Sequence, residues 1–226
     1  MHTRRWLAGG LGLVTMAAAI SCSSSTPPAE IPLDVLGGDT NVPAAQVGNV
    51  VSLGTVKVGA DSVDVNARMT ITKNEGGLVT ARVTADPTKD PRIAKFAALI
   101  PASAKKADGT VDTEVKFRVT TEGVQDFFNK DGKPHTVVKY AGNVGDTYKV
   151  SKSDGVVITR TVVAKSDKDD FPYGFFSIKT MTIEQDSRIP GIKKIVIRAN
   201  HKFGIVHVEA VADDGSTMSS YVLSKN

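Results

Sequence analysis

The chain has 226 residues, 28 Lys and Arg against 24 Asp and Glu, and one cysteine, Cys22. A single cysteine excludes an intramolecular disulfide, and the near balance of charge, without a basic cluster interleaved with aromatic residues, argues against a nucleic-acid partner. A chain of this length can bury a large core without a disulfide staple.

The first 21 residues have the three parts of a secretory signal peptide. Arg4 and Arg5 make the start basic, residues 6–20 carry no charge, and small residues follow. A helix over this uncharged stretch would rise about 22 Å, too short to cross a hydrocarbon core of about 30 Å. We therefore expect residues 1–21 to be removed on export. The stretch TRRWLA at 3–8 also resembles the twin-arginine export motif in part, so the export route stays open.

The stretch AISC at 19–22 resembles the lipobox of bacterial lipoproteins. The resemblance implies cleavage before Cys22, a diacylglyceryl group on its sulfur and often a third acyl chain on its amine. Ordinary signal-peptide cleavage is the alternative, since residues 17–19 and 19–21 both have the small-x-small pattern that precedes such a cleavage site. Because an exported protein gains nothing from one unpaired thiol, we favour lipidation of Cys22. Two or more acyl chains would anchor the protein stably, since each buried methylene contributes roughly 0.8 kcal/mol.

The residues after the cysteine predict which membrane anchors the protein and what connects the folded domain to that membrane. Ser23 is not the Asp that resembles an inner-membrane retention signal, so we expect an outer-membrane lipoprotein of the bacterial cell envelope, facing the periplasm or the cell surface. Residues 23–47 are rich in Ser, Pro, Gly and Ala and cannot bury enough apolar surface to offset their ordering entropy. We expect residues 22–47 to be a lipidated cysteine with a flexible tether, in which the stretch IPLDVL at 31–36 is able to dock locally, and residues 48–226 to form the folded domain.

Strict alternation of apolar and polar residues begins near the predicted start of the domain. Such alternation is typical of a half-buried antiparallel strand. We expect an all-β fold, mainly an antiparallel meander that forms a curved sheet or half-barrel. The clearest strands are expected at 61–71, 113–121, 192–199, 204–212 and 217–224.

Asp-Gly pairs separate several of these strands. Both residues tolerate the positive φ that tight hairpins need. We interpret the pairs as turns rather than calcium loops, because none has the carboxylate spacing of an EF-hand. The pairs lie at 108–109, 131–132, 154–155 and 214–215.

One segment departs from the alternating pattern. Asp90 is a suitable N-cap, Pro91 suits the first helical position and Pro101 stops a helix. The sequence predicts one short helix at 91–100, packed on the sheet. A second, weaker helical turn is expected at 122–128.

Three potential metal ligands, His201, His207 and Glu209, lie close together in the sequence. On a strand, His207 and Glu209 would share a face about 7 Å apart. A zinc site needs three converging ligands, and the mature chain has one further histidine, His135. We interpret His207 and Glu209 as a polar pair on the outer face of the sheet, and predict no metal and no cofactor.

The remaining motifs do not indicate catalysis. Serines are plentiful, but none lies in a Gly-x-Ser-x-Gly elbow, so we predict no catalytic residue and no enzyme. We interpret the acidic residues at 167, 169 and 170 as a solvated turn rather than a calcium site. The stretch FPYGFF at 171–176 has four aromatic side chains in six residues. These side chains either join the core or form an exposed patch for a partner or a lipid.

Residues 144–210 look like uncharacterised bacterial envelope lipoproteins with a curved antiparallel sheet, through stretches such as VGDTYKV and PGIKKIVIRANHKFGIVHVEA. The resemblance implies a fold akin to half-barrel carriers of lipids or lipoproteins. Two functions stay open. One is a membrane-anchored binding or structural module that contacts envelope proteins or polysaccharide. The other is a lipid or lipoprotein carrier with an apolar groove.

Overall fold

The computed structural model describes residues 34–52 and 56–224, so the expected signal peptide and Cys22 lie outside the described residues. Within these ranges the backbone forms seventeen strands, four 3-10 helices and no α-helix. The prediction of an all-β domain with little helix is confirmed. The 3-10 helices are η1 (Pro43–Ala45), η2 (Pro87–Lys89), η3 (Pro91–Leu99) and η4 (Ala102–Ala104).

The first sheet has seven strands in the order β17-β1-β4-β5-β6-β7-β8. All its neighbours are antiparallel, and β4 to β8 follow one another along the chain, as a meander requires. The strands are β1 (Val50–Ser52), β4 (Arg68–Glu75), β5 (Leu78–Ala85), β6 (Val111–Thr120), β7 (Gly123–Asp126), β8 (His135–Lys139) and β17 (Leu223–Ser224).

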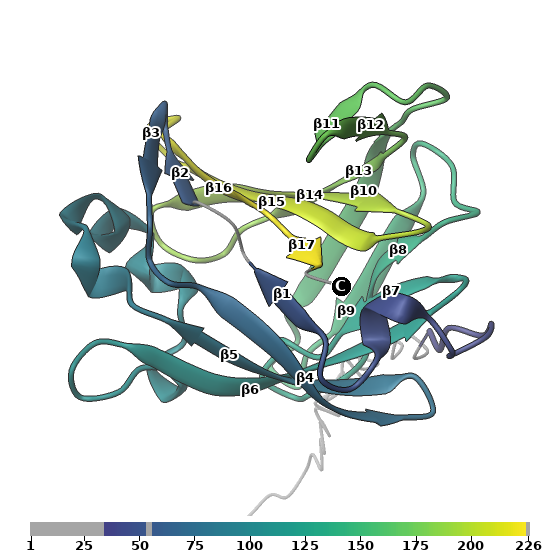
Figure 1. Cartoon of the computed structure of the whole chain (residues 1–226), viewed down its shortest axis with the longest axis horizontal. Coiled ribbons are helices and arrows are strands. Elements are labelled where there is room, and N and C mark those ends of the chain that lie inside the picture. Colours follow the sequence, from purple (N-terminus) through teal and green to yellow (C-terminus); the bar gives the residue numbers. More distant parts are fainter. Residues whose placement is uncertain (1–33, 53–55, 225–226) are drawn as a thin grey trace, which may run out of the picture. The chain divides into compact units, whose positions relative to one another are not determined.

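The second sheet has eight strands in the order β3-β2-β16-β15-β14-β13-β10-β9, again all antiparallel. Its strands are β2 (Val56–Val58), β3 (Asp61–Val63), β9 (Thr147–Ser151), β10 (Val157–Lys165), β13 (Met181–Asp186), β14 (Ile192–Asn200), β15 (Gly204–Ala212) and β16 (Thr217–Tyr221). The two sheets face each other in Figure 1.

The main core fills the space between the two sheets. Val124 and Val138 of the first sheet pack with Val162, Ile183 and Ile197 of the second in one cluster of buried side chains. Along β10 and β13, Val162 and Ile183 alternate with more exposed residues, so the sequence pattern that forms these strands also builds the core. In β7 and at the start of β8, by contrast, successive residues are all buried.

Two of the predicted strands are divided between the two sheets. The single strand expected at 61–71 is wrong, because β3 belongs to the second sheet and β4 to the first. Asn66, between them, has a φ of 50°, and its N–H donates to Asp64 Oδ1 at 2.8 Å. The strand expected at 217–224 likewise divides at Val222 into β16 in the second sheet and β17 in the first.

The helix predicted after Asp90 is present as the 3-10 helix η3. Asp90 Oδ1 accepts a hydrogen bond from the Arg92 N–H at 2.9 Å, as expected of a residue that caps a helix. Phe96 is buried in a cluster that includes Ile192 of β14 and Ala210 of β15, so η3 packs on the second sheet.

The second helical turn, expected at 122–128, is wrong. Residues Gly123–Asp126 form β7, which pairs with both β6 and β8. Gly123 allows this pairing, since a Cβ atom at this position would collide with the carbonyl oxygen of Val138.

The segment 34–47 packs against the first sheet. The Asp34 carboxylate lies 2.8 Å from Lys139 Nζ. Leu36 is 6% exposed and Ala45 is fully buried, in a cluster with Ile71 and other residues of the first sheet. The flexible tether expected here is therefore wrong for this segment, and the folded domain extends upstream of its expected start at residue 48.

The Asp-Gly pairs form turns, as predicted, and their glycines have φ between 60° and 84°. In three of the turns the aspartate accepts a hydrogen bond from the N–H two residues later. In the remaining one, Asp131 accepts hydrogen bonds from the N–H and hydroxyl of Ser153, at 2.6 and 2.7 Å. Because Lys130 Nζ lies 3.0 Å from Asp154 Oδ2, two Asp-Gly turns are joined to each other.

Candidate functional site

A hairpin of aromatic residues stands apart from both main sheets. Its strands β11 (Phe171–Tyr173) and β12 (Phe176–Ile178) pair only with each other within the described residues. They are drawn in green at the top of Figure 1. Gly174 has a φ of 66° at the first central position of the two-residue turn, where type II′ turns place glycine.

Aromatic contacts fix this hairpin to the second sheet. The Tyr173 ring lies 5.1 Å from the ring of Phe203 in the β14–β15 turn, and the Phe171 ring lies 5.7 Å from that of His207. The Tyr173 hydroxyl donates to the carbonyl oxygen of Val222 at 2.8 Å. These contacts hold the base of the hairpin in place, so its turn has a defined position.

His207 lies beneath this hairpin. It is 7% exposed, its ring lies 5.1 Å from that of Tyr221, and its Nδ1 has no hydrogen-bond partner in the described part of the chain. Burial, helped by the positive charges of Arg198 and Lys57, lowers the pKa of His207 to about 4. The ring is therefore neutral at pH 7.

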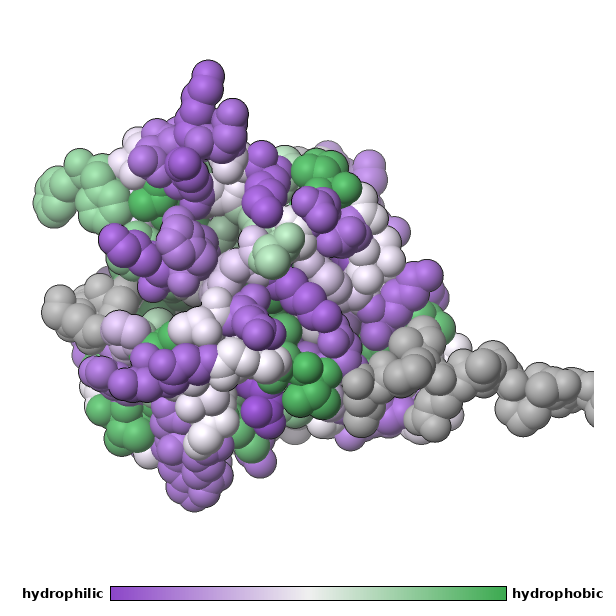
Figure 2. Space-filling model, turned by 90° about the vertical axis from the view of Figure 1, so that its right-hand side faces the viewer, coloured by the Kyte–Doolittle hydropathy of each residue, from purple (hydrophilic) through white to green (hydrophobic). Residues whose placement is uncertain are grey.

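The turn of the hairpin is fully open to water. Phe175 is 107% exposed and Phe176 is 54% exposed, whereas Tyr173 and Ile178 are buried. The sequence stretch 171–176 thus divides into side chains that pack and side chains that project. Figure 2 shows that apolar residues elsewhere on the right-hand side of the molecule are scattered among polar ones.

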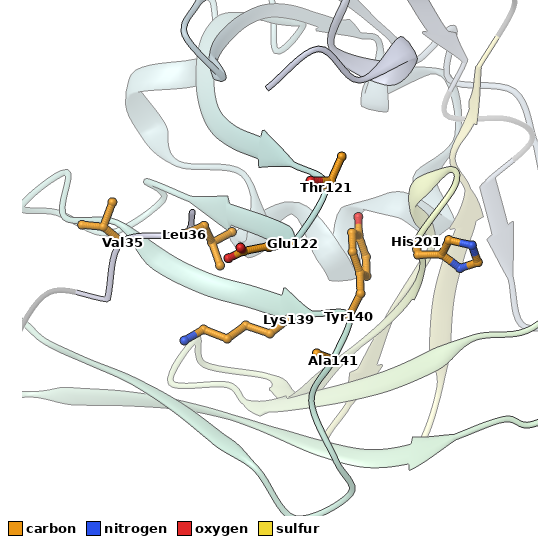
Figure 3. Close-up of a pocket in the computed structure, with 8 residues that line it drawn as sticks. All are labelled: Val35, Leu36, Thr121, Glu122, Lys139, Tyr140, Ala141 and His201. Carbon is orange, nitrogen blue, oxygen red and sulfur yellow. The ribbon is translucent and has the colours of Figure 1, made fainter. Parts of the chain in front are cut away.

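A pocket of about 570 Å³ opens between the N-terminal segment and three turns of the domain. Figure 3 shows its lining, with the Tyr140 ring standing between Glu122 and His201. The lining residues are Val35, Leu36, Thr121, Glu122, Lys139, Tyr140, Ala141 and His201.

The pocket offers both donors and an acceptor. Burial raises the pKa of Tyr140 to about 12, so its hydroxyl keeps its proton at neutral pH. The Glu122 carboxylate lies against the backbone of Gly37. Lys139 is neutralised by Asp34, which comes from the segment that forms one wall. The lysine among the lining residues is therefore already paired with a carboxylate.

A buried ion pair joins the two sheets. Arg160 Nη2 of β10 lies 2.6 Å from Asp126 Oδ2 of β7, and both side chains are 7% exposed. Arg160 also donates from Nε to Gln185 Oε1 at 2.8 Å, and from Nη1 to the carbonyl oxygens of His135 and Thr136. Every one of these contacts is a charge-assisted hydrogen bond.

His135 belongs to the same buried region. Its Nε2 lies 3.1 Å from the carbonyl oxygen of Tyr148, and burial, with the nearby charge of Arg160, lowers its pKa to about 4. This network was not predicted from the sequence. The sequence feature that could have predicted it is Arg160, a charged residue two positions before the core residue Val162 and therefore on the same face of the strand.

The potential metal ligands do not converge. His201 is exposed in the β14–β15 turn and lines the pocket, whereas His207 is buried and Glu209 is half-buried in β15. The outer-face position expected for His207 is wrong, because this residue is 7% exposed and its ring lies against that of Phe171 in the hairpin. Across residues 34–52 and 56–224, no group of three or more His, Cys, Asp or Glu could hold a metal ion. The acidic residues at 167, 169 and 170 are exposed in the loop before β11.

Comparisons of the chain with family models, curated proteins and solved structures find no match. Among the described residues, no helix is long and apolar enough to cross a membrane.

Proposed function

We propose that this chain is a lipid-anchored module of a bacterial cell envelope that binds its partners through its outer surface. One observation favours a binding module over a lipid carrier. The space between the sheets is occupied by packed side chains and by the Arg160–Asp126 pair. A lipid carrier needs an unfilled apolar groove, and a charged pair across that space opposes such a groove.

The AISC stretch at 19–22 supports the anchor. When the full chain is expressed in a bacterial host, mass spectrometry of the mature N-terminus is expected to find an acylated Cys22. Cys22→Ala is expected to release the protein from the membrane fraction, with Ser21→Ala as the matched control that stays attached. An unmodified Cys22, or cleavage at another position, would contradict the anchor.

The absence of an internal ligand is tested separately. Native mass spectrometry of the mature protein is expected to give the mass of the chain and its covalent acyl groups alone, because packed side chains leave no room for a second lipid between the sheets. A co-purifying, non-covalent lipid would instead support a carrier. Its loss in Val138→Asp, with the fold intact, would locate that lipid between the sheets.

A further inference from the structure

We propose that the β11–β12 hairpin is an acid-released flap, which lifts off the second sheet when His207 takes up a proton, while both main sheets stay folded. The proposal is independent of the lipid anchor. His207 is 7% exposed, and its Nδ1 has no hydrogen-bond partner among the described residues. A neutral imidazole can stay in such a site, but an imidazolium has two N–H donors and a charge, which require partners or water.

The hairpin can move away from His207 without breaking either main sheet. The pairing of β10 with β13 is closed by a backbone hydrogen bond, in which the Ser166 N–H donates to the Thr180 carbonyl oxygen at 2.8 Å. Beyond this bond, residues 167–179 leave the second sheet, and in the described chain β11 and β12 pair only with each other. The strand that carries His207, β15, instead pairs with β14 and β16 along its two edges. Lifting the hairpin therefore costs less than opening the sheet around His207.

Phe171, at the base of the hairpin, covers His207. Arg198, His207 and Tyr221 lie opposite one another on β14, β15 and β16, and so form a row across the sheet. The centroid of the Phe171 ring lies 5.7 Å from that of His207 and 5.8 Å from that of Tyr221. The guanidinium carbon of Arg198 lies 5.2 Å from the same centroid. Because one ring covers the row, lifting that ring would let water reach the buried Nδ1 of His207.

Side-chain hydrogen bonds and ring contacts hold the hairpin down while His207 is neutral. The Tyr173 hydroxyl donates to the carbonyl oxygen of Val222 at 2.8 Å, and Asn200 Nδ2 donates to the carbonyl oxygen of Lys179 at 2.7 Å. The Tyr173 ring also lies 5.1 Å from that of Phe203. Release loses these contacts, so the docked state is the stable one at neutral pH.

The cations around His207 oppose its protonation in the docked state. Arg198 lies opposite it on β14, and Lys57 of β2 adds a second positive charge nearby. Burial, together with these two charges, lowers the pKa of His207 to about 4. Arg198 already lies over the Phe171 ring, so that face of the ring is not open to an imidazolium.

The carboxylates near His207 do not offset these cations. Glu209 is two residues farther along β15, and Asp170 comes directly before β11. Neither forms a hydrogen bond or an ion pair with His207 in the part of the chain that the structure describes. Exposed ionisable side chains at the base of the hairpin and in the β14–β15 turn are Lys179, His201 and Lys202.

The difference in pKa between the docked and released states sets the size of the effect. In the released state water would surround His207 and return its pKa to about 6.5, whereas the docked state holds that pKa at about 4. The released state therefore binds the proton first as the pH falls, and the docked state is most favoured above pH 6.5. Between pH 7 and pH 4 the equilibrium constant for release should rise about 100-fold.

Amide hydrogen exchange of the purified full chain measures this release. Mass spectrometry of peptides that cover residues 171–178 reports on the hairpin, and peptides that cover β5 report on the main sheets. After correction for the intrinsic effect of pH on exchange, we expect the protection of the hairpin to fall about 100-fold from pH 7 to pH 4. The amides of β5 should stay more protected than those of the hairpin at both pH values, since release leaves the sheets folded.

Two histidine variants assign the effect. His207→Gln should remove the fall in hairpin protection, whereas His135→Gln, at a second buried histidine with its pKa lowered to about 4, should keep it. His207→Leu repeats the test with an apolar side chain if circular dichroism at pH 7 shows that His207→Gln does not fold. An undiminished fall in the His207 variant would overturn the proposal. So would an unchanged hairpin protection in the native chain, or equal protection of the hairpin and β5 at each pH, and neither result depends on a variant.

Discussion

Replacing Asp126 by Asn is expected to lower the free energy of unfolding by about 3–5 kcal/mol. The substitution leaves the Arg160 guanidinium buried and charged between the sheets without its counterion, 2.6 Å away in the native protein. The polar contacts that remain, to Gln185 and two carbonyl oxygens, carry no negative charge. Urea denaturation of the full chain measures the change.

A surface pair provides the matched control. Asp112 lies 2.7 Å from Arg82, whose side chain is 59% exposed, so water and salt screen this interaction. Asp112→Asn should change the midpoint of denaturation little. A similar small effect for Asp126→Asn would contradict a structural role for the buried pair. Replacing Asp126 and Arg160 together by Leu and Met should recover much of the loss, since no uncompensated charge then remains.

Acidification from pH 6.5 to 4 is expected to destabilise the domain through His135 and His207. Both histidines have a folded-state pKa lowered to about 4, below the ordinary 6.5, chiefly because burial penalises the charged ring. The unfolded chain therefore binds protons first as the pH falls. The free energy of unfolding has its full value above about pH 6.5, decreases as the pH falls towards 4, and is constant again below pH 4. The total decrease is up to about 3 kcal/mol for each histidine.

The pH window separates this effect from that of the carboxylates. The pKa of Asp90 and that of Asp154 are lowered to about 2 by hydrogen bonds to Arg92 and Lys130 respectively, so their contributions are lost chiefly below pH 4. Urea denaturation at pH 7, 5.5 and 4 should give a flatter profile for His135→Gln/His207→Gln than for the wild-type chain. If the free energy of unfolding of this variant depends on pH as steeply as that of the wild-type chain, the two histidines are not the cause.

Alternation is enough to predict the strands of the C-terminal third. The strands expected at 192–199 and 204–212 are β14 and β15, because each has a regular pattern and a turn marked by Gly204, with a φ of 72°. Alternation does not specify which sheet a strand joins. The stretch 61–71 keeps its pattern across a corner, so its division between two sheets is not predictable.

The candidate site is predictable only in part. The aromatic residues at 171–176 stand out in the sequence, but their division into buried Tyr173 and exposed Phe175 depends on the β14–β15 turn that packs beneath them. The ion pair joins Asp126 of the first sheet to Arg160 of the second, so it forms only because the two sheets pack face to face. No local sequence pattern predicts it. Within residues 23–47, the apolar stretch at 31–36 can be recognised as able to dock, whereas average composition gives no sign that Ala45 is buried.

The pairing of β1 with β17 has a consequence for biogenesis. Val51 lies opposite Ser224, and β2 likewise pairs with β16, so both sheets are completed by the end of the chain. Loops this long make closure a late event in folding. A chain that emerges N-terminus first from an export channel would hold β1 and β2 with an open edge until its last residues have crossed. Such edges are templates for aggregation, so the interval between emergence and closure is when the chain most needs a chaperone.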